Sequence, residues 1–71
     1  MNSNMTTKPE KWISPQIIAR RLGVSVKTSR RLIDEGQFVV AKFGGSIRVS
    51  ESSFNSYVDR MVQIYKTNKD A

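Results

Sequence analysis

Two short helix patterns follow one another with almost no chain between them, and this arrangement constrains the fold more than any other feature. Ser14 and Pro15 predict a helix start, because serine can cap a helix and proline loses nothing at the first helical position. Gly23 is typical of a helix end, and Ser25 provides the next N-cap two residues later. The second helix is predicted over residues 26–35. Two helices joined by so short a glycine-containing turn form a helix-turn-helix.

A β-hairpin is predicted after the second helix. Residues 38–43 are rich in β-forming side chains, a glycine-rich turn follows, and residues 47–49 provide a short return strand. A three-residue loop would place Lys42 opposite Arg48. A two-residue loop made of residues 44–45 also fits, so the sequence leaves the register of the two strands open.

A third helix is predicted from Ser50, its N-cap, to about Tyr65. The chain is then predicted to be one small α+β domain, a winged helix-turn-helix with a two-stranded hairpin as the wing and a C-terminal helix. This domain covers residues 12–65, while residues 1–11 are predicted to be a flexible N-terminal arm and residues 66–71 a polar C-terminal tail. The apolar residues at helical spacing in the third helix are Phe54, Tyr57, Val58, Met61 and Tyr65.

The charge balance indicates the kind of partner. The 71 residues contain 12 Lys and Arg against 6 Asp and Glu, a net charge of +6, which favours a polyanion such as nucleic acid. The sequence has no Cys and no His, which excludes zinc fingers, iron–sulfur sites and catalysis by either side chain. Because the carboxylates form no paired acid–base pattern, we expect no catalytic residues, no enzyme activity, no metal and no cofactor. No apolar run is long enough to span a membrane, so we expect a cytoplasmic protein without a membrane partner.

The basic residues concentrate around the second helix. Seven of the 12 lie between Arg20 and Arg48, a stretch that contains only two acidic residues. Three of them are three or four positions apart and therefore share one helix face, where arginine can bind phosphates and guanine edges of double-stranded DNA. An ordinary solvated face is the alternative, but the position after a helix-turn favours a recognition helix in the major groove. The candidate recognition residues are Lys27, Thr28, Arg30 and Arg31, with Arg20, Arg21 and Ser25 as weaker phosphate contacts.

The hairpin is the second candidate DNA contact. Its glycine tip lets the backbone approach a groove closely, and flanking cations suit the negative minor groove. An ordinary glycine turn is the alternative, and the neighbouring helix-turn-helix favours a wing that contacts DNA. The candidate wing residues are Lys42, Gly44, Gly45 and Arg48.

The aromatic side chains have two interpretations. Exposed rings beside basic residues could stack on single-stranded bases. We interpret them instead as core residues, because a core this small needs large apolar side chains. The residues concerned are Trp12, Phe38, Phe43, Phe54, Tyr57 and Tyr65.

Residues 12–60 resemble the excisionase-type, MerR-like winged-helix DNA-binding domains. The resemblance rests on the order of several short motifs: a Ser-Pro helix start, an Ala before a Leu-Gly-Val-Ser turn, a Thr in the second helix, Leu-Ile before Gly, a glycine hairpin tip and a Ser-capped last helix. These are Ser14-Pro15, Ala19, Leu22-Gly23-Val24-Ser25, Thr28, Leu32-Ile33, Gly36, Gly44 and Ser50. The sequence departs from the family at Ile17, Ser29 and Val39, where the family usually has Glu, an inward-packing aliphatic residue and Pro.

The resemblance implies that the second helix enters the major groove and that the wing touches the minor groove or phosphates, through the residues named above. Small members of this family are excisionases, also called recombination directionality factors, which bind repeated sites, bend the DNA and recruit a tyrosine integrase. The resemblance therefore implies an excisionase-like architectural protein of a phage or mobile element, with an integrase and cooperative copies of itself as further partners. A small AlpA-like transcriptional regulator with the same fold, and a protein-interaction module for an acidic partner, are the alternatives.

Overall fold

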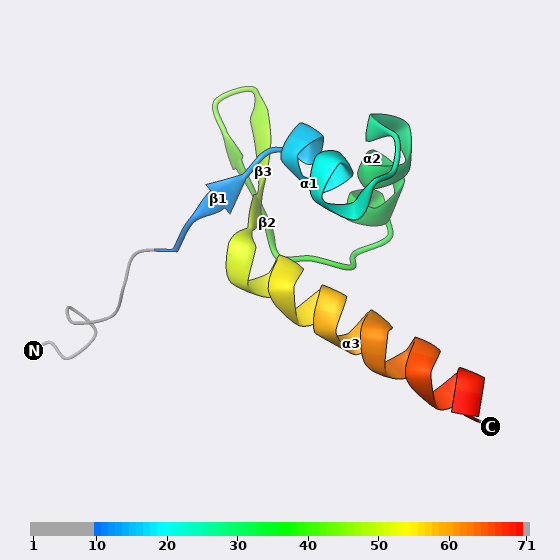
Figure 1. Ribbon diagram of the computed structural model, residues 1–71. Helices are drawn as coiled ribbons and strands as arrows, with labels where there is room; N and C mark the ends of the chain where they lie inside the picture. The colour runs from blue at the N-terminus through cyan, green and yellow to red at the C-terminus, as the bar shows by residue number, and fades with distance from the viewer. Residues whose placement is uncertain (1–9, 71) are drawn as a thin grey trace, which may run out of the picture.

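The computed structural model describes residues 10–70, with side chains up to residue 67. Residues 1–9 of the predicted arm and residue 71 of the predicted tail lie outside the described residues. The two short helices and the hairpin lie together, and the long last helix extends away from them (Figure 1). In chain order the elements of the described part are β1 (Trp12–Ile13), α1 (Pro15–Leu22), α2 (Val26–Asp34), β2 (Val40–Phe43), β3 (Ser46–Ser50) and α3 (Glu51–Asp70).

The two short helices begin where the sequence predicts. The hydroxyls of Ser14 and Ser25 each accept a backbone N–H three residues further on, at 3.2 Å and 3.1 Å. Gly23 has a φ of +70°, a conformation that glycine adopts without strain and that turns the chain from α1 into α2. α2 ends at Asp34, one residue earlier than predicted, with Glu35 as its C-cap.

The strands form a three-stranded antiparallel sheet in the order β1-β3-β2. Trp12 pairs with Ser50, and Ile13 with Val49. The sequence does not predict β1, because a strand of two residues is too short to show alternation. The predicted two-stranded wing is therefore the outer part of a larger sheet, and the predicted α+β winged helix-turn-helix fold is confirmed.

The hairpin has the register of the two-residue loop, which is one of the two registers that the sequence leaves open. The loop consists of Gly44 and Gly45, and Lys42 pairs with Ile47 rather than with Arg48. Because side chains alternate between the faces of a strand, Arg48 lies on the opposite face of the hairpin from Lys42. β2 also begins two residues later than the predicted strand.

The core lies between α1, the sheet and the start of α3. Ile18 and Val49 are fully buried at its centre. Phe38 stacks edge-on against Tyr57, with ring centroids 4.9 Å apart, and thereby joins the segment before β2 to α3. The buried apolar cluster consists of Ile13, Ile18, Phe38, Val49 and Phe54.

The aromatic residues divide between core and surface. Burial of Phe38 and Phe54 confirms the prediction for these two, and Tyr57 is half-buried against them. The prediction is wrong for three others at the surface, namely Trp12 (37% exposed), Phe43 (51%) and Tyr65 (65%). The rings of Trp12 and Phe43 meet edge-on at 5.5 Å, on the sheet face that strand alternation places opposite the core.

Ser29 occupies a position where an aliphatic side chain is usual, and it is fully buried. Its hydroxyl lies 3.0 Å from the carbonyl oxygen of Pro15 and 2.7 Å from that of Val26, so these two acceptors share its one proton. The contact with Pro15 joins α2 to α1 by a hydrogen bond where an aliphatic side chain would only pack. The buried hydroxyl is therefore satisfied, and the two helices remain in contact.

The first turn of α3 is tied to the segment before β1. The Ser52 N–H and hydroxyl donate to the Glu10 carboxylate at 3.2 Å and 3.0 Å. The Glu51 N–H donates to the Lys11 carbonyl oxygen at 2.9 Å. Within the described residues, the contacts of the domain therefore include Glu10 and Lys11, which belong to the segment predicted as an arm, because the free N–H groups at the start of α3 need acceptors.

α3 runs to Asp70, so the predicted helix end near Tyr65 is wrong. Residues 66–70 of the predicted polar tail continue the helix, since this stretch contains neither Gly nor Pro to end it. The Ser50 hydroxyl accepts the Ser53 N–H at 3.2 Å, which confirms the predicted N-cap. None of the helices in the described chain has the length and apolar character needed to cross a membrane.

Candidate nucleic-acid interface

α2 presents basic side chains to solvent. Lys27, Arg30 and Arg31 are exposed, whereas Thr28 is half-buried and its hydroxyl accepts from the N-cap serine at 3.0 Å. A shallow hollow of about 380 Å³ on this helix is lined by these four residues and Asp34. The structure therefore brings the four predicted recognition residues together on one face of α2.

The two exposed arginines of α2 differ in their ion pairs. The Nε atom of Arg31 lies 3.8 Å from a carboxylate oxygen of Glu35, one helical turn further on. Arg30 forms no ion pair within the described part of the chain, although Asp34 lines a small cavity beside it. Among the described residues, the guanidinium of Arg30 and the ammonium of Lys27 are therefore the cations of α2 that no carboxylate holds, and their donors are available to a partner.

The three weaker candidates lie on α1 and in the turn before α2. Arg20 is exposed, and the hydroxyl of Ser25 already caps α2. The Nη1 atom of Arg21 lies 2.9 Å from Oε2 of Glu51, so this guanidinium joins α1 to the start of α3. Contact of these three residues with phosphate stays a prediction, and for Arg21 it would compete with the ion pair.

The two glycines of the wing tip border open space. A Cβ atom added to Gly44 or Gly45 would meet no other atom within 4 Å, so both glycines border open space. Lys42 is exposed, whereas Arg48 is half-buried and its Nη1 donates to the Ile47 carbonyl oxygen at 2.8 Å. The wing therefore offers a cation on each face and a tip that a groove wall can approach closely.

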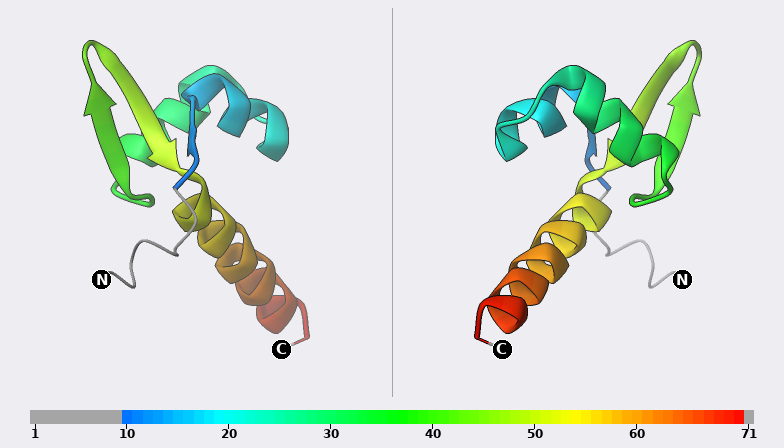
Figure 2. Two further views of the ribbon diagram at one scale, coloured as in Figure 1. Left: turned by 90° about the vertical axis from the view of Figure 1, so that its left-hand side faces the viewer. Right: turned by 90° about the vertical axis from the view of Figure 1, so that its right-hand side faces the viewer.

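A polar cleft of about 320 Å³ separates α2 from the wing. It is bordered by Pro15 and Gln16 at the start of α1, by Arg30, and by residues 45–48 of the wing. Gln16 is not among the predicted residues, because one uncharged polar side chain near a helix start has no distinctive pattern. The hairpin tip lies at the opposite end of the molecule from the C-terminal end of α3 (Figure 2). We name the surface formed by α2 and the whole wing the α2–wing face, with Lys42 and Arg48 on opposite faces of the hairpin. It comprises Lys27, Thr28, Arg30, Arg31, Lys42, Gly44, Gly45 and Arg48.

The fold and this face define a winged helix-turn-helix protein. Residues 12–62 match the model of a helix-turn-helix domain family. The match covers most of the 71 residues, so the protein belongs to this family, which includes excisionase-like DNA-binding domains. Comparison with curated proteins and with solved structures gives no match. A helix-turn-helix is a DNA-binding module, and DNA is accordingly the partner that the α2–wing face fits.

Proposed function

We propose that this protein is an excisionase-like factor that promotes site-specific recombination of a phage or mobile element without catalysing the reaction itself. It binds specific double-stranded sites, bends the DNA and recruits a tyrosine integrase, and cooperative copies occupy neighbouring sites. The observation that carries the proposal is the α2–wing face, where exposed cations of a recognition helix and an open glycine tip lie on either side of one polar cleft. Membership of a family that includes excisionase-like domains supports it.

The mechanism divides between the two parts of the face. α2 enters the major groove, where the guanidinium of Arg30 can donate two hydrogen bonds to the O6 and N7 atoms of guanine. Lys27 and Arg31 neutralise phosphates on either side. The wing reaches the adjacent minor groove or its phosphates, because Gly44 and Gly45 allow close backbone approach. Contacts on two sides of the duplex offset the cost of bending it.

A mobility-shift titration at several salt concentrations tests DNA binding. About five to seven phosphate contacts predict a slope of roughly −4 to −6 for log affinity against log salt concentration. A preference for duplex over single-stranded DNA and a slope of this size are expected. Salt-insensitive binding, or no preference for duplex DNA, would contradict DNA binding and favour an acidic protein as the partner.

An excision assay with a tyrosine integrase and its attachment sites, with and without this protein, tests the finer role. We expect excision to require the protein and to stop when Arg30 is replaced by alanine, while the integrase alone still integrates. Repression of a reporter placed behind the bound site, together with no effect on excision, would contradict the recombination role. That result would instead make the protein a small transcriptional regulator with the same fold.

A further inference from the structure

The far half of α3 carries exposed apolar side chains. Phe54 in its first turn is buried, whereas Met61, Val62 and Ile64 are 36%, 47% and 47% exposed. In Figures 1 and 2, α3 leaves the body of the protein and its last turns extend beyond the other elements. Intrinsic propensity stabilises such an extension only weakly, and clustered exposed apolar residues mark interaction surfaces.

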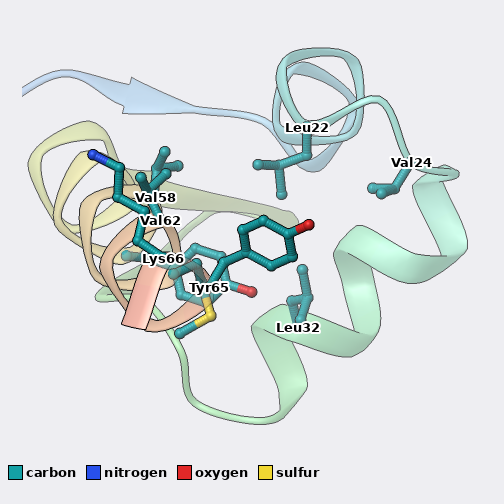
Figure 3. Close-up of a pocket in the computed structure, with 9 residues that line it drawn as sticks. Leu22, Val24, Leu32, Val58, Val62, Tyr65 and Lys66 are labelled. Atoms are coloured by element: carbon teal, nitrogen blue, oxygen red, sulfur yellow. The ribbon is translucent and has the colours of Figure 1, made fainter. Parts of the chain in front are cut away.

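An apolar groove of about 650 Å³ lies between this part of α3 and the helix-turn-helix. Figure 3 shows the side chains from α1, α2 and their turn across the gap from those of α3. Lys66 is the one charged residue in the lining. We name this feature the α3 groove, and its lining includes Leu22, Val24, Leu32, Val58, Val62 and Tyr65.

We propose that the occupant of the α3 groove is α3 of a second copy of this protein, packed antiparallel about a two-fold axis near residues 62–63. A two-fold contact uses the same surface twice, so each copy must supply both a groove and an apolar ridge that fills it. α3 has both features, because Met61 and Val62 line the groove and are themselves exposed. Filling each groove with the other copy's helix removes these side chains from water.

Charge selects the direction of packing. Asp59 and Lys66 are seven residues apart and therefore lie two turns apart on one side of α3. An antiparallel contact centred near residues 62–63 places Asp59 of each copy beside Lys66 of the other, twice by symmetry, whereas a parallel contact would place like charges side by side. Exposed ion pairs of this kind add little affinity. They fix the orientation, while the apolar side chains supply the affinity.

The charge of the far half of α3 also permits contact between copies. Residues 59–70 contain two acidic and three basic residues, so this segment carries +1 out of the net +6 of the chain. Two α2–wing faces would repel one another, whereas two α3 segments meet with little net charge. Because α3 ends opposite the hairpin tip, pairing through α3 leaves both α2–wing faces exposed.

Sedimentation velocity on the full chain, without DNA, tests the pairing from micromolar to millimolar concentration. We expect wild type to pass from monomer to dimer, and Val62→Glu to remain monomeric. Thr67→Glu adds the same charge on a side of α3 that faces away from the groove lining and should still dimerise. A wild type that stays monomeric at every concentration, or a dimer that persists in Val62→Glu, would overturn the proposal. Thermal unfolding of each variant separates a lost contact from a lost fold.

A charge exchange tests the orientation. Asp59→Lys and Lys66→Glu should each raise the dimer dissociation constant about tenfold, because each change removes two ion pairs and creates two like-charge contacts. The double variant restores both pairs with reversed polarity and should return to the wild-type constant. A double variant as weak as the single ones overturns the antiparallel arrangement. Since no DNA is present, none of these outcomes depends on the proposed recombination role.

Discussion

The α2–wing face and the α3 groove lie in different parts of one small domain and are built from opposite kinds of side chain. The first gathers exposed cations around a polar cleft, and the second gathers apolar residues around a single lysine. A charged surface contributes little to folding, so its residues can be chosen for a partner. An exposed apolar surface costs solubility unless it is covered. The comparison implies two separable functions, in which substitutions in one region alter DNA binding and substitutions in the other alter self-association.

Replacing Arg30 by alanine should have the largest effect on the α2–wing face. We expect DNA affinity to fall about fivefold to 150-fold, equivalent to about 1–3 kcal/mol, with reduced discrimination between sites if the guanidinium reads a base. Its fold should be unaffected, since Arg30 is exposed and forms no ion pair within the described chain. Mobility-shift titrations against specific and unrelated DNA measure both quantities.

Two further variants calibrate that result. Arg31→Ala should cost less than Arg30→Ala, because the guanidinium of Arg31 already faces Glu35. Arg60→Ala removes the same charge from α3, where the guanidinium lies over the ring of Tyr57 with its carbon 5.7 Å from the centroid. Equal losses of DNA affinity from Arg30→Ala and Arg60→Ala would mean that net charge alone governs binding. That result would contradict the assignment of DNA binding to the α2–wing face rather than to α3.

Ser29→Ala tests the hydrogen bond that holds α2 against α1. Removing the buried hydroxyl should lower the free energy of unfolding by about 1–2 kcal/mol, because the hydrogen bond that joins α2 to the Pro15 carbonyl oxygen of α1 is lost in a site closed to water. Ser56→Ala replaces an exposed serine in α3 and should be neutral or slightly stabilising. Urea unfolding of both variants measures the difference, and equal midpoints would show that the hydroxyl contributes nothing to holding α2 against α1.

The helix-turn-helix was predictable from sequence because its signals are local. Ser14, Gly23 and Ser25 act within one turn of the chain, through caps and a positive φ, and each does so in the structure. The basic face of α2 follows from helical spacing alone. Helical spacing does not predict which arginines are free of ion pairs. Arg21 pairs with Glu51, which is thirty residues away in the sequence, and only the fold brings the two together.

The features that were not predicted depend on long-range contacts or have no local signal in the sequence. β1 consists of two residues that become a strand only by pairing with β3. Phe43 resembles a core residue in sequence, yet the two-residue loop places it on the outer face of the sheet beside Trp12. α3 continues past Tyr65 because no breaker follows, and its groove depends on how far α3 diverges from α1 and α2, which no periodicity reveals.

The two wing glycines give a smaller and sharply matched comparison. Gly44 has a φ of +62°, whereas Gly45 does not adopt a left-handed conformation, and both border open space. Gly44→Ala should therefore lower the free energy of unfolding by about 1 kcal/mol through backbone strain alone, and Gly45→Ala should change it little. Thermal unfolding of the pair measures this difference. Equal losses would mean that the tip has another conformation and that the register of the wing needs revision.

The smallest expected effect is on the pH dependence of stability, and it tests whether Glu10 anchors the first turn of α3. The Ser52 N–H and hydroxyl bind the Glu10 carboxylate and hold its pKa below the usual value. Since the pKa of Glu10 is lower in the folded state, its contribution to stability is full above the ordinary glutamate pKa and is lost as pH falls through the folded pKa.

Glu10→Gln should make the loss of stability with falling pH shallower, whereas Glu35→Gln removes a carboxylate elsewhere as a control. Urea midpoints across the acid range measure the slopes. A Glu10→Gln slope equal to that of wild type would mean that Glu10 does not hold the first turn of α3, and the anchor would then rest on the Lys11 carbonyl and the Arg21–Glu51 ion pair.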